Sequence, residues 1–133
     1  MATYTLQQLF QAGFRLLGGE SVSKAIAEPN WSTYTGVVAL AGGGQTGATP
    51  LLGTVNSVDT VASANDSVSL PAATGRGKPV VVINSTATSM QVFGAGTDTI
   101  NGVATGTGVA QAAGKTAVYI SAASGAWYRL LSA

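Results

Sequence analysis

The 133-residue chain is predicted to be mainly β, an antiparallel β-sandwich or barrel of the jelly-roll kind with a short helical N-terminal segment. Two observations predict this fold. Short runs rich in β-branched and aromatic residues follow one another through most of the chain, and turn residues such as Gly94, Asn101-Gly102 and Gly125 separate them. No repeat of fixed period is found. The length suits one domain with its own core.

Residues 1–30 are expected to form the helical segment. Leu6, Phe10 and Phe14 recur at a spacing of four, with Leu9 and Leu17 beside them, which places apolar side chains on one face of a helix. The Gly18-Gly19 pair is a helix stop, and a second short helix is expected over 21–28, before Pro29. The apolar face would pack either on this chain's own β-core or on a neighbouring molecule.

Residues 31–54 are expected to form a Gly/Thr-rich arm with one strand, and residues 55–133 the β-domain. The Gly42–Gly47 stretch is typical of a flexible turn or arm. Residues 79–83 are apolar without alternation, so we expect a central strand that is buried on both faces. The expected strands cover residues 35–40, 55–61, 67–70, 79–84, 89–93, 99–100, 108–111, 116–121 and 126–131.

The amino-acid composition favours a protein that associates with other copies or other proteins over one that catalyses a reaction. Charged residues make up 8% of the chain, against about 25% in an average soluble domain. A nearly neutral surface causes little repulsion between copies, although a soluble monomer with a Ser/Thr-rich surface is the alternative. The net charge is +1 and the basic residues are scattered, so we expect no nucleic-acid partner. No apolar run approaches the ~18 residues that would span a bilayer, so we expect no membrane partner.

Catalytic and metal-binding side chains are scarce. The chain has no histidine and no cysteine, which excludes Ser-His-Asp and Cys-His arrangements and the usual zinc ligands. Asp66 and Asp98 stand in turn-like contexts, where an aspartate bonds nearby backbone. The Gly42-x-Gly44-x-x-Gly47 match to a dinucleotide fingerprint lacks the helix that must follow it, because Ala48-Thr49-Pro50 come next. We therefore predict no catalytic residue, no cofactor and no metal.

Adjacent aromatic residues near the C-terminus are candidates for contacts. Trp127 and Tyr128 would point to opposite faces of one strand, for core packing or for a contact between subunits. The residues predicted to contact a capsid or another subunit are Leu6, Leu9, Phe10, Phe14, Leu17, Trp31, Trp127 and Tyr128.

An ordered series of short motifs spans about residues 55–131. It comprises Leu70-Pro71, the glycines of 75–77, the strand 80–84 that closes on Asn84, Val92-Phe93, the turn Asp98-Thr99-Ile100-Asn101-Gly102, the stretch 112–117 and Gly125-Ala126-Trp127-Tyr128. This series resembles the C-terminal β-domain of small bacteriophage virion proteins, namely capsid decoration (cement) proteins and head-fibre proteins. The chain departs from their pattern at Gly94-Ala95-Gly96, where a turn containing proline is more usual.

The resemblance implies a homotrimer that binds the assembled major capsid protein lattice and stabilises it. The protein would be made in the host cytoplasm and would reside on the capsid surface of the virion. The alternative is a tail-fibre, spike or head-fibre component that binds a host surface. A carbohydrate-acting enzyme or a lectin is a third hypothesis, which rests only on Trp127, Asp66 and Asp98.

Overall fold

The structure, a computed structural model, describes residues 31–133. The expected N-terminal helices, with Leu6, Leu9, Phe10, Phe14 and Leu17, lie outside the described residues. Residues from Ser32 to Ala133 form one compact unit. Its ten strands are β1 (Thr33–Val38), β2 (Thr49–Pro50), β3 (Val55–Thr60), β4 (Ser67–Ser69), β5 (Pro79–Asn84), β6 (Met90–Phe93), β7 (Thr99–Ile100), β8 (Val109–Gln111), β9 (Thr116–Ala123) and β10 (Ala126–Leu131).

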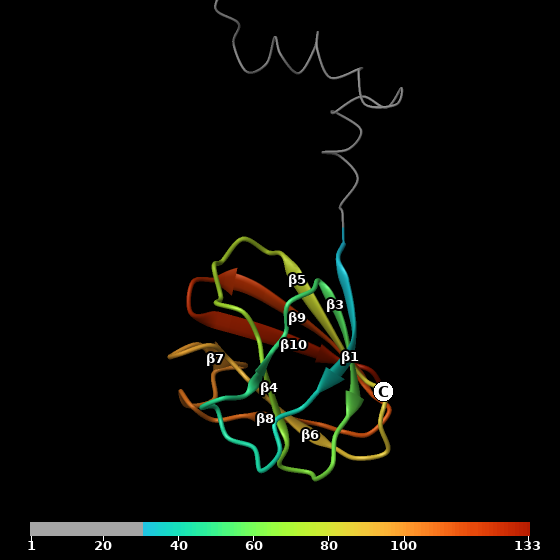
Figure 1. Cartoon of the computed structure of the whole chain (residues 1–133). Helices are drawn as coiled ribbons and strands as arrows, with labels where there is room; N and C mark the ends of the chain where they lie inside the picture. Colours follow the sequence, from blue (N-terminus) through green and yellow to red (C-terminus); the bar gives the residue numbers. More distant parts are fainter. Residues whose placement is uncertain (1–30) are drawn as a thin grey trace, which may run out of the picture. The chain divides into compact units, whose positions relative to one another are not determined.

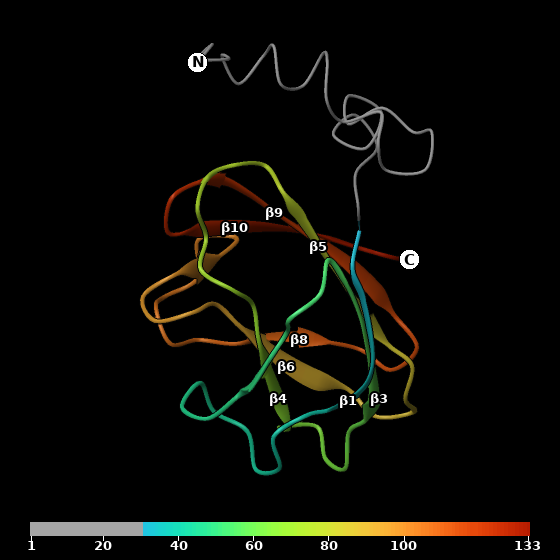
Figure 2. The same ribbon diagram turned by 45° about the horizontal axis from the view of Figure 1, so that its top comes forward.

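The strands form two sheets, and the chain alternates between them. We call one passage through both sheets a coil. Sheet A has the strand order β1-β3-β5-β9-β10-β7, and sheet B the order β2-β4-β6-β8. Each of the first three coils contributes one strand to sheet A and one to sheet B (Figures 1 and 2). Because the chain returns to the same sheet one strand further along, strands of neighbouring coils run parallel, as β1, β3 and β5 do. The result is a β-solenoid of about four turns.

The predicted antiparallel sandwich or jelly-roll-like barrel is therefore wrong, although the chain is mainly β as predicted. Five of the eight strand pairings are parallel. The expected strands themselves were nearly right, since 79–84, 99–100 and 126–131 match β5, β7 and β10. The pairing differs because consecutive strands lie in opposite sheets and therefore do not form hairpins, with the exception of β9 and β10.

The coils differ in length, which is why no fixed period exists in the sequence. In sheet A, Thr33 lies opposite Val55, 22 positions later, whereas Val55 lies opposite Val81, 26 positions later. In sheet B, Thr49 lies opposite Val68, only 19 positions later. A solenoid needs each coil to return to its sheet, and corners of different length satisfy that requirement.

In the last turn, the chain direction is reversed relative to the preceding turns, and this turn closes one end of the solenoid. β8 pairs antiparallel with β6, and β9 pairs antiparallel with β5. β10 then returns along β9, and β7 pairs parallel with β10 at the far edge of sheet A. At the other end, β1 and β2 each have a partner strand on one side only among the described strands.

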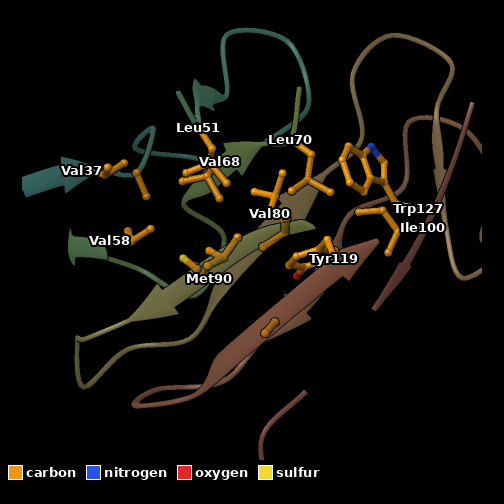
Figure 3. Close-up of a cluster of buried hydrophobic side chains, with 14 of the residues drawn as sticks. Val37, Leu51, Val58, Val68, Leu70, Val80, Met90, Ile100, Tyr119 and Trp127 are labelled. Atoms are coloured by element: carbon orange, nitrogen blue, oxygen red, sulfur yellow. The ribbon is translucent and has the colours of Figure 1, made fainter. Parts of the chain in front are cut away.

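The hydrophobic core lies between the two sheets. Val58 of sheet A and Val68 and Met90 of sheet B are fully buried there (Figure 3). Val82 of sheet A is also fully buried. Tyr119, Ile100 and Trp127 fill the end that the last turn closes. Burial alternates along β5, so this strand is buried on its inner face only. The expectation that residues 79–83 are buried on both faces is wrong.

Similar turns form three of the corners, which are the loops where the chain passes from one sheet to the other. The amide N–H of Asp66 donates to the carbonyl of Ser63 at 3.0 Å, that of Asp98 to Ala95 at 2.8 Å, and that of Ala48 to Gln45 at 3.2 Å. The Asp66 carboxylate also accepts the N–H groups of Ala62 and Ser63, at 2.7 and 3.1 Å. The turn role predicted for Asp66 is confirmed. The 42–47 stretch leads into one of these corners and is followed by β2, not by a helix.

Buried amide side chains connect the coils where the backbone leaves a sheet. The Asn84 amide nitrogen lies 2.9 Å from the carbonyl oxygen of Thr88 and 3.2 Å from those of Gln111 and Ala112. Its amide oxygen accepts the N–H and the hydroxyl of Thr86. Gln111 similarly donates to the carbonyls of Val82 and Lys115. These bonds give the buried side-chain amides partners among the backbone carbonyls of neighbouring segments.

Candidate interaction surface

The outer face of sheet A carries apolar side chains in rows that cross four strands. One row runs from Val55 through Val81 and Val118 to Leu130, each residue opposite the next in the strand register. A second row joins residues of β5, β9 and β10 next to it. We define the apolar face as Val55, Pro79, Val81, Ile83, Val118, Ile120, Tyr128 and Leu130.

No third sheet of the described chain packs over this face of sheet A. Leu130 is 73% exposed, Tyr128 54% and Ile120 43%, and the other five are half-buried by their neighbours in the sheet. The alternation of strands explains the pattern, because every second residue of β5 and β9 must face outward. A solvated face normally carries polar residues at these positions. Here it carries valine, isoleucine, leucine and tyrosine.

The apolar face holds no charged residue. The nearest carboxylate in β3 is Asp59, at the end of that strand. Its oxygens accept hydrogen bonds from the Ser57 and Ser85 hydroxyls, both at 2.6 Å, and from the Gly36 N–H. These bonds, the one from Ser57 foremost, lower the pKa of Asp59 below 3.8. Asp59 thus holds a bulge in the edge strand β1 in place.

The residues predicted to make contacts fall in different places. Tyr128 lies on the apolar face, whereas Trp127 points into the core and is 3% exposed. Trp31 is half-exposed and precedes β1. Sequence reasoning missed Leu130, Ile120 and Val118. The signal for them was the presence of apolar residues at successive positions of 116–121 and 126–131, so that both faces of each strand carry apolar side chains.

The carboxylates of residues 31–133 do not gather into a metal-binding cluster. Residues 31–133 contain no group of three or more His, Cys, Asp or Glu side chains that would hold a metal ion. Asp66 is 2% exposed, and hydrogen bonds, the largest from the Ser63 hydroxyl, lower its pKa below 3.8. The Asp98 carboxylate accepts the N–H of Ala73 at 2.7 Å. Both aspartates therefore hold backbone segments in place.

Within the same residues, no helix is long and apolar enough to cross a membrane. Comparisons with protein-family models, with curated proteins and with solved structures find no match to the chain.

Proposed function

We propose that the chain is a capsid decoration protein of a bacteriophage, a virion structural protein that binds the assembled major capsid protein lattice as a homotrimer. The observation that carries the proposal is the apolar face of sheet A. Contiguous exposed apolar patches are rare on soluble monomers and mark sites of association. The resemblance of residues 55–131 to bacteriophage virion proteins supports the assignment to a virion.

The apolar face is the proposed contact between the three copies. Other copies of this chain are the occupants that the face fits, because uncharged apolar side chains from three copies can gather around one axis without burying an unpaired charge. Burial of Leu130, Tyr128 and Ile120, the most exposed of them, would give the largest gain on association. Three copies around one axis form a closed assembly, which leaves no apolar face open to further growth.

Stabilisation of the capsid, which we call cementing, then follows from mass action. A protein that binds the assembled lattice but not its separated subunits stabilises the lattice, and a trimer adds avidity to each single contact. The apolar residues predicted on one helical face, Leu6, Phe10 and Phe14, are the proposed capsid contact. No proton transfer, metal or cofactor is required.

The test is to add purified protein to undecorated capsids of the parent phage and to measure occupancy and resistance to heat. The proposal predicts saturable binding in multiples of three and a higher temperature of capsid disruption. Leu130→Asp should reduce occupancy, whereas Leu52→Asp should not. Leu52 is the matched control because it is a leucine with 65% exposure, against 73% for Leu130, and it lies outside the apolar face. Absence of binding, or binding without stabilisation, would contradict cementing.

A tail-fibre, spike or head-fibre component is the second candidate. The observation that favours it is the edge formed by β1 and β2, which has no further partner strand among residues 31–133 and to which parallel coils or another shaft segment can add. Copy number in purified virions separates the two functions: a decoration protein is present in hundreds of copies and a fibre component in few.

A further inference from the structure

A pocket of about 260 Å³ lies at the corner where the chain passes from sheet B to sheet A. Two connecting loops, 51–54 and 71–78, form much of its wall, and Ser32, the start of β5 and residues of β9 and β10 complete it. Leu52, Ala72 and Lys78 are exposed, so the rim reaches the surface. This volume lies below the range of about 300–1,000 Å³ for sites of drug-sized ligands. It suits a ligand the size of one sugar or one amino acid.

Two buried polar atoms of the pocket residues have no hydrogen-bond partner among the described residues. They are the Thr54 hydroxyl oxygen and the Trp127 indole nitrogen, and both residues are 3% exposed. Other polar groups of the same wall are satisfied: Ser121 accepts the N–H of Gly75 at 2.8 Å and donates to the carbonyl of Ala123 at 3.1 Å. Buried polar groups are nearly always paired, so two unpaired groups in one pocket point to a missing partner.

The chemistry of the unpaired groups defines that partner. The indole nitrogen only donates, and the threonine hydroxyl donates or accepts. Lys78 adds a cation at the rim and has no ion pair or hydrogen bond within residues 31–133. A ligand with acceptor oxygens and a negative charge, such as a carboxylate, would satisfy all three groups. The remaining wall is apolar and includes Leu51, Pro71 and Val80, so it suits the carbon skeleton of such a ligand.

We propose that this pocket binds a small carboxylate whose oxygens accept hydrogen bonds from Trp127 and Thr54 and pair with Lys78. Both polar atoms are covered in this conformation, so binding requires the groups that cover them to move aside. The carboxylate comes either from a sugar acid or from an acidic residue of a polypeptide, and the two sources share this chemistry. The inference is independent of the proposed role on the capsid.

The test follows the two indole N–H signals of the full-length protein by ¹H–¹⁵N NMR during titration. Glucuronate and N-acetylglutamate are the two carboxylate probes, and glucose and N-acetylglutamine are their uncharged controls. We expect one or both carboxylates to shift the Trp127 signal saturably, while the Trp31 signal and the uncharged probes show no change. Trp127→Phe assigns the signal. Which carboxylate binds more tightly identifies the source.

Variants test each group of the site. Lys78→Met should weaken binding about tenfold, the value of one charged hydrogen bond, and Lys115→Met should leave it unchanged. Lys115 is the matched control because it precedes β9 at the end opposite Ser121. Thr54→Val should weaken binding without loss of thermal stability, since it removes an unpaired hydroxyl. No shift with either carboxylate, equal binding by the Lys78 variant, or an indole N–H bonded to an ordered water only would overturn the proposal.

Discussion

Replacement of Asn84 by alanine tests the solenoid most sharply among single substitutions. Asn84 is fully buried, and its side chain connects the end of β5 to the 86–88 turn and to the end of β8. The two amide hydrogens serve three carbonyl oxygens within 3.2 Å, and the amide oxygen accepts two bonds from Thr86. About four effective hydrogen bonds are therefore lost. At about 1 kcal/mol each, the free energy of unfolding should fall by about 4 kcal/mol.

Such a loss is a large part of the roughly 5–15 kcal/mol that stabilises a domain of this size. The assay is urea unfolding, monitored by the fluorescence of the buried Trp127, for wild type, Asn84→Ala and Asn65→Ala. Asn65 is exposed and makes no side-chain hydrogen bond within the described residues, so its variant should stay within about 0.5 kcal/mol of wild type. In a sandwich, Asn84-Ser85 would be an exposed turn, and both variants would be mild. A cost below about 1 kcal/mol for Asn84→Ala would refute the solenoid reasoning.

Three further predictions concern backbone geometry and pH. Gly43→Ala should unfold more easily than Gly44→Ala, because both residues have positive φ but only a Cβ at Gly43 would lie 1.9 Å from the Asn65 carbonyl oxygen; thermal melts compare the pair. Because the pKa of Asp66 is lowered in the folded state, its contribution to stability is present above pH 3.8 and is lost as the pH falls through the lowered value. Asp66→Asn should be less stable near neutral pH and should lose less stability on acidification, as followed by circular dichroism; equal losses on acidification would contradict this. Burial, opposed by nearby Arg129, raises the pKa of Tyr119 to about 12 from 10.0, so Tyr119 favours the folded state below pH 10 and loses this effect as the pH rises toward 12. Tyr119→Phe should therefore show a smaller fall in unfolding midpoint at alkaline pH than wild type, and parallel curves would count against the burial of Tyr119.

Local patterns in the sequence predicted where the strands lie but not how they pair. Turn residues lie on both sides of Pro79–Asn84 and directly before Ala126–Leu131, so these limits were predictable. Pairing depends on whether the chain between two strands turns back or crosses to another sheet. The 61–66 corner has the turn residues of a hairpin, yet it carries the chain from sheet A to sheet B. Neighbouring strands usually pair, and that tendency led to the sandwich.

The surface was predictable only in part for a related reason. The alternation across Trp127 and Tyr128 was predicted, and Trp127 faces the core while Tyr128 faces solvent. Apolar residues at both parities of β5 indicated two covered faces, and one of them has no cover among residues 31–133. The sequence of one chain does not distinguish a face covered by its own fold from a face covered by another copy. The pocket at the sheet corner depends on loops from different coils, which no local pattern brings together.

The most direct test of association through the apolar face is the molar mass of the protein in solution, measured by light scattering after size-exclusion chromatography. Wild type and Leu52→Asp should elute at three times the chain mass of 13.2 kDa, and Leu130→Asp at the mass of one chain with unchanged circular dichroism. A wild-type protein that stays a monomer at high concentration, or a Leu130→Asp variant that remains a trimer, would contradict this account.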